Sequence, residues 1–222
     1  MTSHAVFAGM PDAGLAFLED LEERNTKEFF DANKRVFLEQ VQAPFVALVD
    51  AACARLRRGL PGLGQPKVFR IYRDLRFSKD KTPYKTSMSA RVTHPAAGGV
   101  EAAYYVNVGP SGMYAGGGRY HWARPELERL RAAVAGEDTG DELARILRRA
   151  EGRGMELWLD PLQRMPRPYP ADHPRAELLR ARSLTLGRRR ERGPWLRTGE
   201  VLDHLVADWR ALVPLNRWLE RL

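Results

Sequence analysis

Cysteine is almost absent from this 222-residue chain, whose one cysteine is Cys53. A single cysteine excludes a disulfide within the chain and a cysteine-built metal cluster. Cys53 lies in the segment AACARL with no histidine nearby, so we interpret it as a small buried side chain and not as a nucleophile. The five histidines show no zinc-ligand spacing, and we predict neither a metal site nor a cofactor.

Long apolar runs are also missing. No stretch of about 18 consecutive apolar residues occurs, so no membrane-spanning helix and no membrane partner are predicted. The first residues lack a basic region followed by an apolar one, which argues against a signal peptide and for a cytoplasmic protein. We expect residues 1–10 to be a loose segment, and no linker divides the chain, so we predict a single domain over residues 1–222.

Lysine is scarce as well, with six lysines against 30 arginines. Four of the six lysines lie between residues 67 and 91. An ammonium group is a compact charge with a shiftable pKa, and arginine does not replace it freely. The concentration of lysine therefore indicates that this segment uses lysine chemistry.

The net charge of +8 is concentrated in two stretches. Residues 67–91 hold eight basic and two acidic residues, and residues 180–197 hold seven basic residues and one acid. Each stretch carries +6, so the remainder of the chain carries −4, and focused positive charge attracts anions. We interpret the run GRRRERG at 187–193 as a solvated loop, with contact to a nucleic-acid backbone as the alternative.

The hydrophobic period changes along the chain from helical to strand-like and back. Asn25 and Glu28 are predicted to cap a helix that Pro44 kinks or restarts, and Thr139 with Glu142 to cap a later helix. Short strands joined by short turns favour an antiparallel meander. The predicted fold is α+β, an antiparallel sheet with helices packed on one face and at both chain ends. Strands are expected at 69–77, 86–94, 102–108, 113–122, 155–159 and 183–186, and helices at 12–23, 26–58, 125–134, 143–150, 174–182 and 201–219.

The segment RIYRDLRFSKDKTPYKTS, residues 70–87, is the strongest functional feature. On an extended strand Arg70, Asp74 and Arg76 share one face, which suits a phosphate or carboxylate ligand. Arg73 falls on the apolar side, so either a bulge turns it outward or an acid pairs with it inside the protein. Arg119 and His121 follow the triple glycine 116–118, which we interpret as a bulge or a tight strand crossing.

This segment resembles the signature of domain-of-unknown-function family 2461, a bacterial family of conserved hypothetical proteins. The signature is Arg, two residues, Arg-Asp, one residue, Arg-Phe, then Asp or Asn with Lys, then Tyr and a basic residue, then Asn. The matching positions are Arg70, Arg73, Asp74, Arg76, Phe77, Asp80, Lys81, Tyr84 and Lys85. Ser87 stands where the family usually has Asn. Further likeness at 29–34, 116–118, 167–174 and 214–219 extends it over nearly the whole chain, and it implies no established activity.

Three functions stay open from the sequence. The first is a binding site for a small phosphorylated or carboxylated anion, which becomes an enzyme site if a histidine supplies acid–base chemistry. The second is a nucleic-acid-binding module. The third is a structural or interaction protein whose arginines pair internally, with Asp31 and Glu28 as the expected acids. No catalytic residue and no oligomeric state are assigned. The candidate ligand-binding residues are Arg70, Arg73, Asp74, Arg76, Lys79, Lys81, Tyr84, Lys85, Arg119, His121 and His173.

Overall fold

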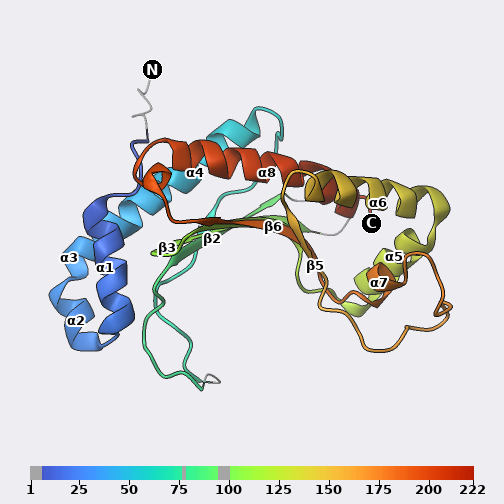
Figure 1. Ribbon diagram of the computed structural model, residues 1–222, viewed down its shortest axis with the longest axis horizontal. Coiled ribbons are helices and arrows are strands. Elements are labelled where there is room, and N and C mark those ends of the chain that lie inside the picture. The colour runs from blue at the N-terminus through green and yellow to red at the C-terminus, as the bar shows by residue number, and fades with distance from the viewer. Residues whose placement is uncertain (1–6, 77–78, 95–100) are drawn as a thin grey trace. The chain divides into compact units, whose positions relative to one another are not determined.

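The computed structural model describes residues 7–76, 79–94 and 101–222. It contains a six-stranded antiparallel sheet in the order β1-β2-β3-β4-β6-β5, with helices at both chain ends (Figure 1). The α+β prediction is therefore confirmed. The strands are β1 (Lys67–Val68), β2 (Met88–His94), β3 (Ala102–Gly109), β4 (Gly112–Arg119), β5 (Glu156–Trp158) and β6 (Leu184–Glu191).

Eight α-helices, one π-helical segment and one 3-10 turn complete the described part of the chain. They are α1 (Asp12–Glu23), α2 (Lys27–Ala32), α3 (Lys34–Val36), the π-helical η1 (Phe37–Gln42), α4 (Ala43–Arg57), α5 (Arg124–Ala135), α6 (Glu137–Glu151), α7 (Ala176–Arg180), the 3-10 turn η2 (Pro194–Arg197) and α8 (Glu200–Leu219).

The chain forms two compact units. The first unit comprises Met1–Val92, Tyr105–Tyr114 and Arg189–Ala207, and the second comprises Thr93–Tyr104, Ala115–Arg188 and Asp208–Leu222. The single domain expected from the sequence stays a prediction.

In the first unit, aromatic side chains join the N-terminal helices. Phe17 of α1 lies 6.2 Å from Phe30 of α2, and Phe30 lies 5.2 Å from Phe37, measured between ring centroids. The predicted cap at Asn25 is wrong by one residue, because Thr26 accepts the hydrogen bond from the Phe29 N–H at 3.2 Å. The Asn25 side chain instead binds a distant backbone segment.

Helices α3, η1 and α4 follow one another without a break, and Pro44 lies in the first turn of α4. Proline has no N–H, so the Gln40 carbonyl four residues earlier lacks its helical partner. Gly14 of α1 packs against that carbonyl so closely that a Cβ there would lie 2.0 Å from the oxygen. A π-helical segment lies directly before Pro44, and α4 begins at Ala43 with the proline in its first turn, so the α-helix restarts there as expected.

The helical run Lys34–Arg57 is, within the described ranges, the one helix long and apolar enough to cross a membrane by length and composition. Core helices of soluble proteins share this property, and Phe45, Leu48 and Val49 of this run are completely buried in the protein. The charged residues Glu39 and Asp50 interrupt the run.

The strand expected over 69–77 is wrong over its described residues 69–76, because β1 ends at Val68 and only Tyr72 forms an isolated bridge, to Tyr84. After β1, which pairs with β2, hydrogen bonds join the two chain limbs only at intervals: the Arg73 N–H donates to the Pro83 carbonyl and the Lys85 N–H to the Ile71 carbonyl. Pro83 cannot donate, so a regular ladder ends there. Residues 69–76 and 79–87 thus form an irregular two-limbed projection, hereafter the arm (Figure 1). Phe77 and Ser78 of the signature lie outside the described residues.

In the second unit, the glycines of β4 allow close strand contact. Gly118 has φ +118°, and a Cβ there would lie 2.3 Å from the Leu184 carbonyl oxygen, while one on Gly117 would lie 2.6 Å from that of Ala103. These approaches agree with the tight strand crossing expected from the triple glycine.

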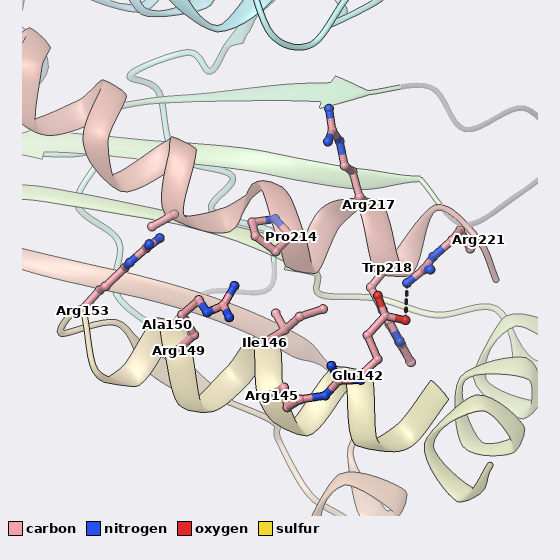
Figure 2. A pocket seen from close by; sticks show the side chains of 11 residues that line it. Glu142, Arg145, Ile146, Arg149, Ala150, Arg153, Pro214, Arg217, Trp218 and Arg221 are labelled. Atoms are coloured by element: carbon pink, nitrogen blue, oxygen red, sulfur yellow. Dashed lines mark hydrogen bonds and ion pairs between the residues drawn. The ribbon is translucent and has the colours of Figure 1, made fainter. Parts of the chain in front are cut away.

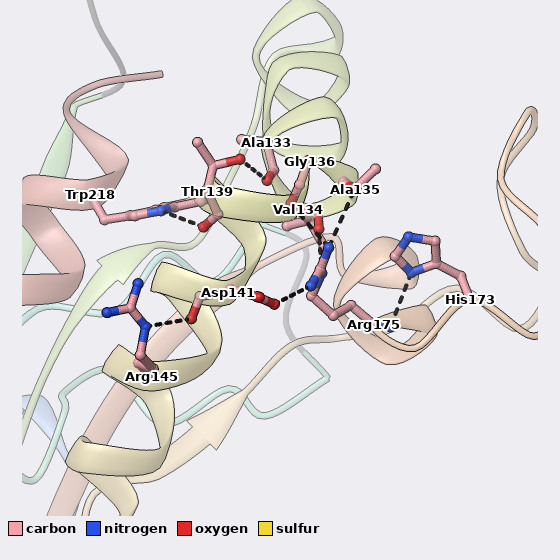
Figure 3. Close-up of polar contacts among 10 residues, drawn as sticks. All are labelled: Ala133, Val134, Ala135, Gly136, Thr139, Asp141, Arg145, His173, Arg175 and Trp218. Carbon is pink, nitrogen blue, oxygen red and sulfur yellow. Dashed lines mark hydrogen bonds and ion pairs between the residues drawn. The ribbon is translucent and has the colours of Figure 1, made fainter.

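The junction between α5 and α6 is stabilised by Arg175 (Figure 3). Its guanidinium donates to the carbonyls of Val134, Ala135 and Gly136 and to Asp141. Arg175 therefore binds the carbonyls of the last residues of α5 and of Gly136, which also accepts from the Gly140 N–H of α6.

The capping box predicted at Thr139 and Glu142 is wrong, because α6 begins at Glu137. Thr139 donates its hydroxyl to the Ala133 carbonyl, and Glu142 pairs with Arg221.

The basic run at 187–193 is not a solvated loop, since β6 includes Gly187 to Glu191. Gly187 pairs with Glu156 of β5, so the run continues the sheet. The side chain of Arg188 is half-buried, and its Nη1 lies 3.2 Å from Oδ1 of the buried Asp208. Arg188 thus pairs with the buried Asp208 carboxylate, which would be costly to leave without a cationic partner.

Candidate functional site

The charged side chains of the arm pair with each other. Arg76 binds Asp74 through two hydrogen bonds, 3.0 Å from Nε to Oδ1 and 2.7 Å from Nη2 to Oδ2. Nη1 of Arg73 lies 2.7 Å from Oδ2 of Asp80. The hydrogen bonds from Arg76 lower the pKa of Asp74, and the backbone N–H of Thr82 is the main cause of a lowered pKa at Asp80. Both carboxylates are therefore ionised partners of the arm's own arginines.

Two lysines of the arm also bind within the arm, but their partners are backbone carbonyls. Nζ of Lys81 donates to the Leu75 carbonyl and Nζ of Lys85 to the Arg70 carbonyl, each at 3.0 Å. These contacts cross-link the two limbs where regular ladder hydrogen bonds are missing. Among the described residues, the side chains of Arg70 and Lys79 make no hydrogen bond or ion pair.

The acids expected to pair with the arginines were wrongly chosen. Asp31 pairs with Lys27 of its own helix, and the arginine partners are Asp74 and Asp80 of the arm. An acid within the same short loop is reached with little loss of chain entropy, which favours it over a distant one. Arg73 is 32% exposed and turned toward Asp80, so it is neither buried nor directed to the core.

Tyr84 fastens the arm to the helices of the first unit. It is 3% exposed, and its ring stacks on Phe30 with centroids 4.2 Å apart. Asn25 binds the Tyr84 backbone twice, since its amide donates to the Tyr84 carbonyl and its oxygen accepts from the Tyr84 N–H, both at 3.0 Å. Burial raises the pKa of Tyr84. This signature tyrosine is a packing residue in the structure.

The remaining predicted site residues belong to the second unit and have separate partners. Arg119 binds both oxygens of Glu126, at 3.1 and 3.0 Å, and the carbonyl of Glu101. The exposed His121 ring lies edge-on to Tyr120 at 4.5 Å. Nδ1 of His173 accepts a hydrogen bond from the Arg175 N–H at 3.0 Å (Figure 3). Their role as ligand-binding residues stays a prediction.

A groove that the sequence analysis missed lies between α6 and α8 in the second unit (Figure 2). Its volume is about 470 Å³, which is within the range of small-molecule sites. Arginines and one glutamate surround an apolar floor. The lining residues are Glu142, Arg145, Ile146, Arg149, Ala150, Arg153, Ala211, Pro214, Arg217, Trp218 and Arg221.

The positive charge of the groove is unevenly compensated. At one end Glu142 binds Arg221 at 2.8 Å. The guanidinium of Arg217 points away from α6 in Figure 2. Arg149 and Arg153 make no side-chain hydrogen bond or ion pair with any described residue, and Nε of Arg145 donates only to the Asp141 carbonyl, at 3.3 Å. The arginines of α6 and of the turn after it thus supply most of the uncompensated charge.

A sequence signal for this groove exists but is concealed by nearby acids. Arg145, Arg149 and Arg153 recur every fourth residue, and neighbouring like charges at this spacing destabilise a helix by about 0.2–0.5 kcal/mol per pair. The range Glu137–Glu151 nevertheless holds five acids and three arginines, so its net charge is negative. The helix dipole favours cations in the last turn of α6 and accounts for Arg149, but not for Arg145 one turn earlier or for Arg153 in the turn after the helix.

The other chemistries have little support in the described ranges. No group of three or more His, Cys, Asp or Glu side chains there is placed to hold a metal ion. Cys53 is completely buried, and burial raises the pKa of its thiol to about 11. A buried thiol with so high a pKa is a poor nucleophile at neutral pH.

A family model described as "Conserved hypothetical protein (DUF2461)" matches residues 13–218. The chain belongs to this family. The resemblance expected from the sequence is confirmed over nearly the whole chain. Comparison with the curated proteins and with the solved structures gives no match. The DUF2461 match includes the arm and every groove residue except Arg221.

Proposed function

We propose that this DUF2461 protein binds a small phosphorylated or carboxylated ligand in the groove between α6 and α8. One observation carries the proposal: Arg145, Arg149 and Arg153 line one side of a groove of about 470 Å³, and none of them has an acidic partner among the described residues. A guanidinium binds carboxylate or phosphate through two parallel hydrogen bonds.

An anion in the groove would also relieve repulsion between the arginines. Arg149 has no acid three or four residues away along the chain, and Glu156, the one acid at that distance from Arg153, lies in β5. No helical ion pair therefore offsets the mutual repulsion of Arg149 and Arg153. The apolar floor excludes water from one side of the ligand and so strengthens each charge–charge contact.

The proposal keeps the anion predicted from the sequence but moves its site. Arg73, Arg76, Lys81 and Lys85 of the arm hold the arm's own carboxylates and carbonyls, and an anion would have to displace them. We therefore assign the arm a structural role, which is the third function left open by the sequence.

Nucleic-acid binding is less well supported than a small anion. In the second basic stretch Arg188, Arg192 and Arg197 pair with Asp208, Glu19 and Asp12. Each paired arginine contributes less to a phosphate backbone than a free one, because the acid must be displaced or left beside the phosphate.

The test is binding of inorganic phosphate, citrate and adipate by calorimetry and thermal shift. A ligand at a hundred times its Kd stabilises by about 2.7 kcal/mol, or roughly 5–10 °C for a chain of this size. The double substitution Arg149→Ala with Arg153→Ala should abolish the shift. The matched control is Arg148→Ala, which removes a neighbouring exposed arginine outside the groove and should leave the shift unchanged. Equal loss in the control, or shifts only with polynucleotides, would count against the groove.

A further inference from the structure

We infer that the ligand of the groove is an elongated molecule with an anionic group at each end and an apolar middle. This inference rests on the proposed function and narrows it from anions in general to α,ω-dianions. It follows from the spacing of the arginines, from the floor between the helices and from the way the groove ends.

The arginines of α6 form a row with a fixed repeat. An α-helix rises about 1.5 Å per residue, so positions four apart are displaced by about 6 Å and positions eight apart by about 12 Å along the axis. Arg149 lies in the last turn of α6, which ends at Glu151, and Arg145 lies one turn earlier. Arg153 follows in the turn directly after the helix. One anionic group between Arg149 and Arg153 and a second beside Arg145 would be separated by about 6–12 Å.

The floor between these positions is apolar. Ile146 and Ala150 of α6 face Pro214 of α8 (Figure 2). Ala211 of α8 also lines the groove. Apolar side chains offer no hydrogen bond to a hydroxylated or amide spacer, whereas methylene groups gain free energy by leaving water there. The middle of the ligand is therefore expected to be hydrocarbon.

An aromatic or nucleobase middle is disfavoured by Trp218. This indole is only 2% exposed, and its N–H donates to the Thr139 carbonyl at 3.1 Å. Its ring face is consequently unavailable as a stacking platform, which single-stranded nucleic acids and nucleotides would use.

An ion pair limits the groove at one end. Beyond Arg145 the Glu142 carboxylate is already paired with Arg221. A third anionic group there would meet a like charge and would have to break that pair, which costs free energy. The row of arginines thus suits two anionic groups and sets an upper limit on their separation.

The test is calorimetric titration with straight-chain saturated dicarboxylates: succinate, adipate, suberate and sebacate. Hexanoate and octanoate are the single-charge controls. Two linked groups that bind together gain an effective concentration that raises affinity by about 10²–10⁴-fold at best. We expect suberate or sebacate to bind at least about tenfold more tightly than octanoate, and succinate, whose carboxylates lie closer together than one helical turn, to show no such gain.

Arg145→Ala separates the two charged positions. It should reduce suberate affinity to that of octanoate while leaving octanoate binding intact, and Arg148→Ala should change neither. Circular dichroism and Tm of each variant control for folding. If phosphate and octanoate bind but a second carboxylate adds nothing, the dianion inference is wrong and the proposed function survives. If no anion binds at all, the proposed function fails with it.

Discussion

Replacing Asn25 with alanine tests whether the arm is held by the contacts described above. The Asn25 amide makes two hydrogen bonds to the Tyr84 backbone, both 3.0 Å long and partly buried. A hydrogen bond contributes about 0.5–1.5 kcal/mol net, and a buried group left unpaired costs about 1–3 kcal/mol. Because water reaches part of this site, we take the lower half of these ranges and expect Asn25→Ala to lower the free energy of unfolding by about 2 kcal/mol.

Urea unfolding followed by circular dichroism gives the free energy, and limited proteolysis with trypsin reports on the arm. Trypsin cleaves after lysine and arginine, which are dense in residues 69–87, so Asn25→Ala should accelerate cleavage there before global unfolding. Thr26→Ala is the matched comparison. It removes a helix cap worth about 1 kcal/mol but no contact to the arm, so it should not accelerate that cleavage. An Asn25→Ala protein with unchanged stability and unchanged cleavage would refute the anchoring role.

Further predictions concern the strand crossing, the buried thiol and the aromatic anchor. Gly118→Ala should lower stability by more than about 2 kcal/mol, because φ is +118° and the new Cβ would clash with the Leu184 carbonyl. Gly59→Ala, whose Cβ would make only an ordinary contact with the Leu56 carbonyl oxygen at 4.0 Å, should stay within about 1 kcal/mol by urea unfolding. Cys53 should react with a thiol reagent at pH 8 only when urea unfolds the protein. Its pKa of about 11 exceeds the ordinary value of 9.0, so its contribution to stability is complete below pH 9 and is lost as the pH rises through about 11. Tyr84→Phe should keep the stack on Phe30 and leave Tm nearly unchanged, whereas Tyr84→Ala should cost about 3–5 kcal/mol.

Periodicity in the sequence was sufficient for most of the fold. Alternation in 102–108 and helical spacing in 201–219 predict β3 and α8, because each has one face against the core. It failed where the chain compensates for a missing backbone donor. At Pro44 the helix widens into a π-helical segment, and at Pro83 the ladder lapses into single bonds. Neither the π-helical segment nor the irregular hydrogen bonding produces a hydrophobic periodicity that can be recognised in the sequence.

The arm was recognised in the sequence as a special segment, but its pairing was not. A strict strand would place Asp74 and Arg76 on one face as ligand-binding groups, and in the irregular arm they instead bind each other. Asn25 resembles a helix cap because Asn is favoured at caps, yet it serves as a backbone clamp on Tyr84, 59 residues away. A long-range contact of this kind leaves no local pattern.

The groove was missed because half of it comes from elsewhere in the chain. Arg149 on α6 faces Pro214 on α8, and only folding brings the two helices together. Acids in the first turns of α6 also cancel the arginines in any sum over the segment, although they lie at the opposite end of the helix from Arg149 and Arg153. Assigning each residue to its position along and around the helix would separate these acids from the arginines, whereas the net charge of the segment does not.

Whether each cation has an acidic partner therefore locates an anion site better than the number of cations in a stretch of sequence does. Arg76 lies in the most basic stretch of the chain, but an acid two residues away neutralises it. Arg149 lies in a stretch of negative net charge, but it has no acid within helical reach. The field that a ligand meets depends on charges left uncompensated within a few ångströms, since solvent and salt screen the more distant ones. By this criterion Lys81 and Lys85 serve to cross-link the two limbs of the arm through backbone carbonyls, and the arginines of α6 are the cations available to a ligand.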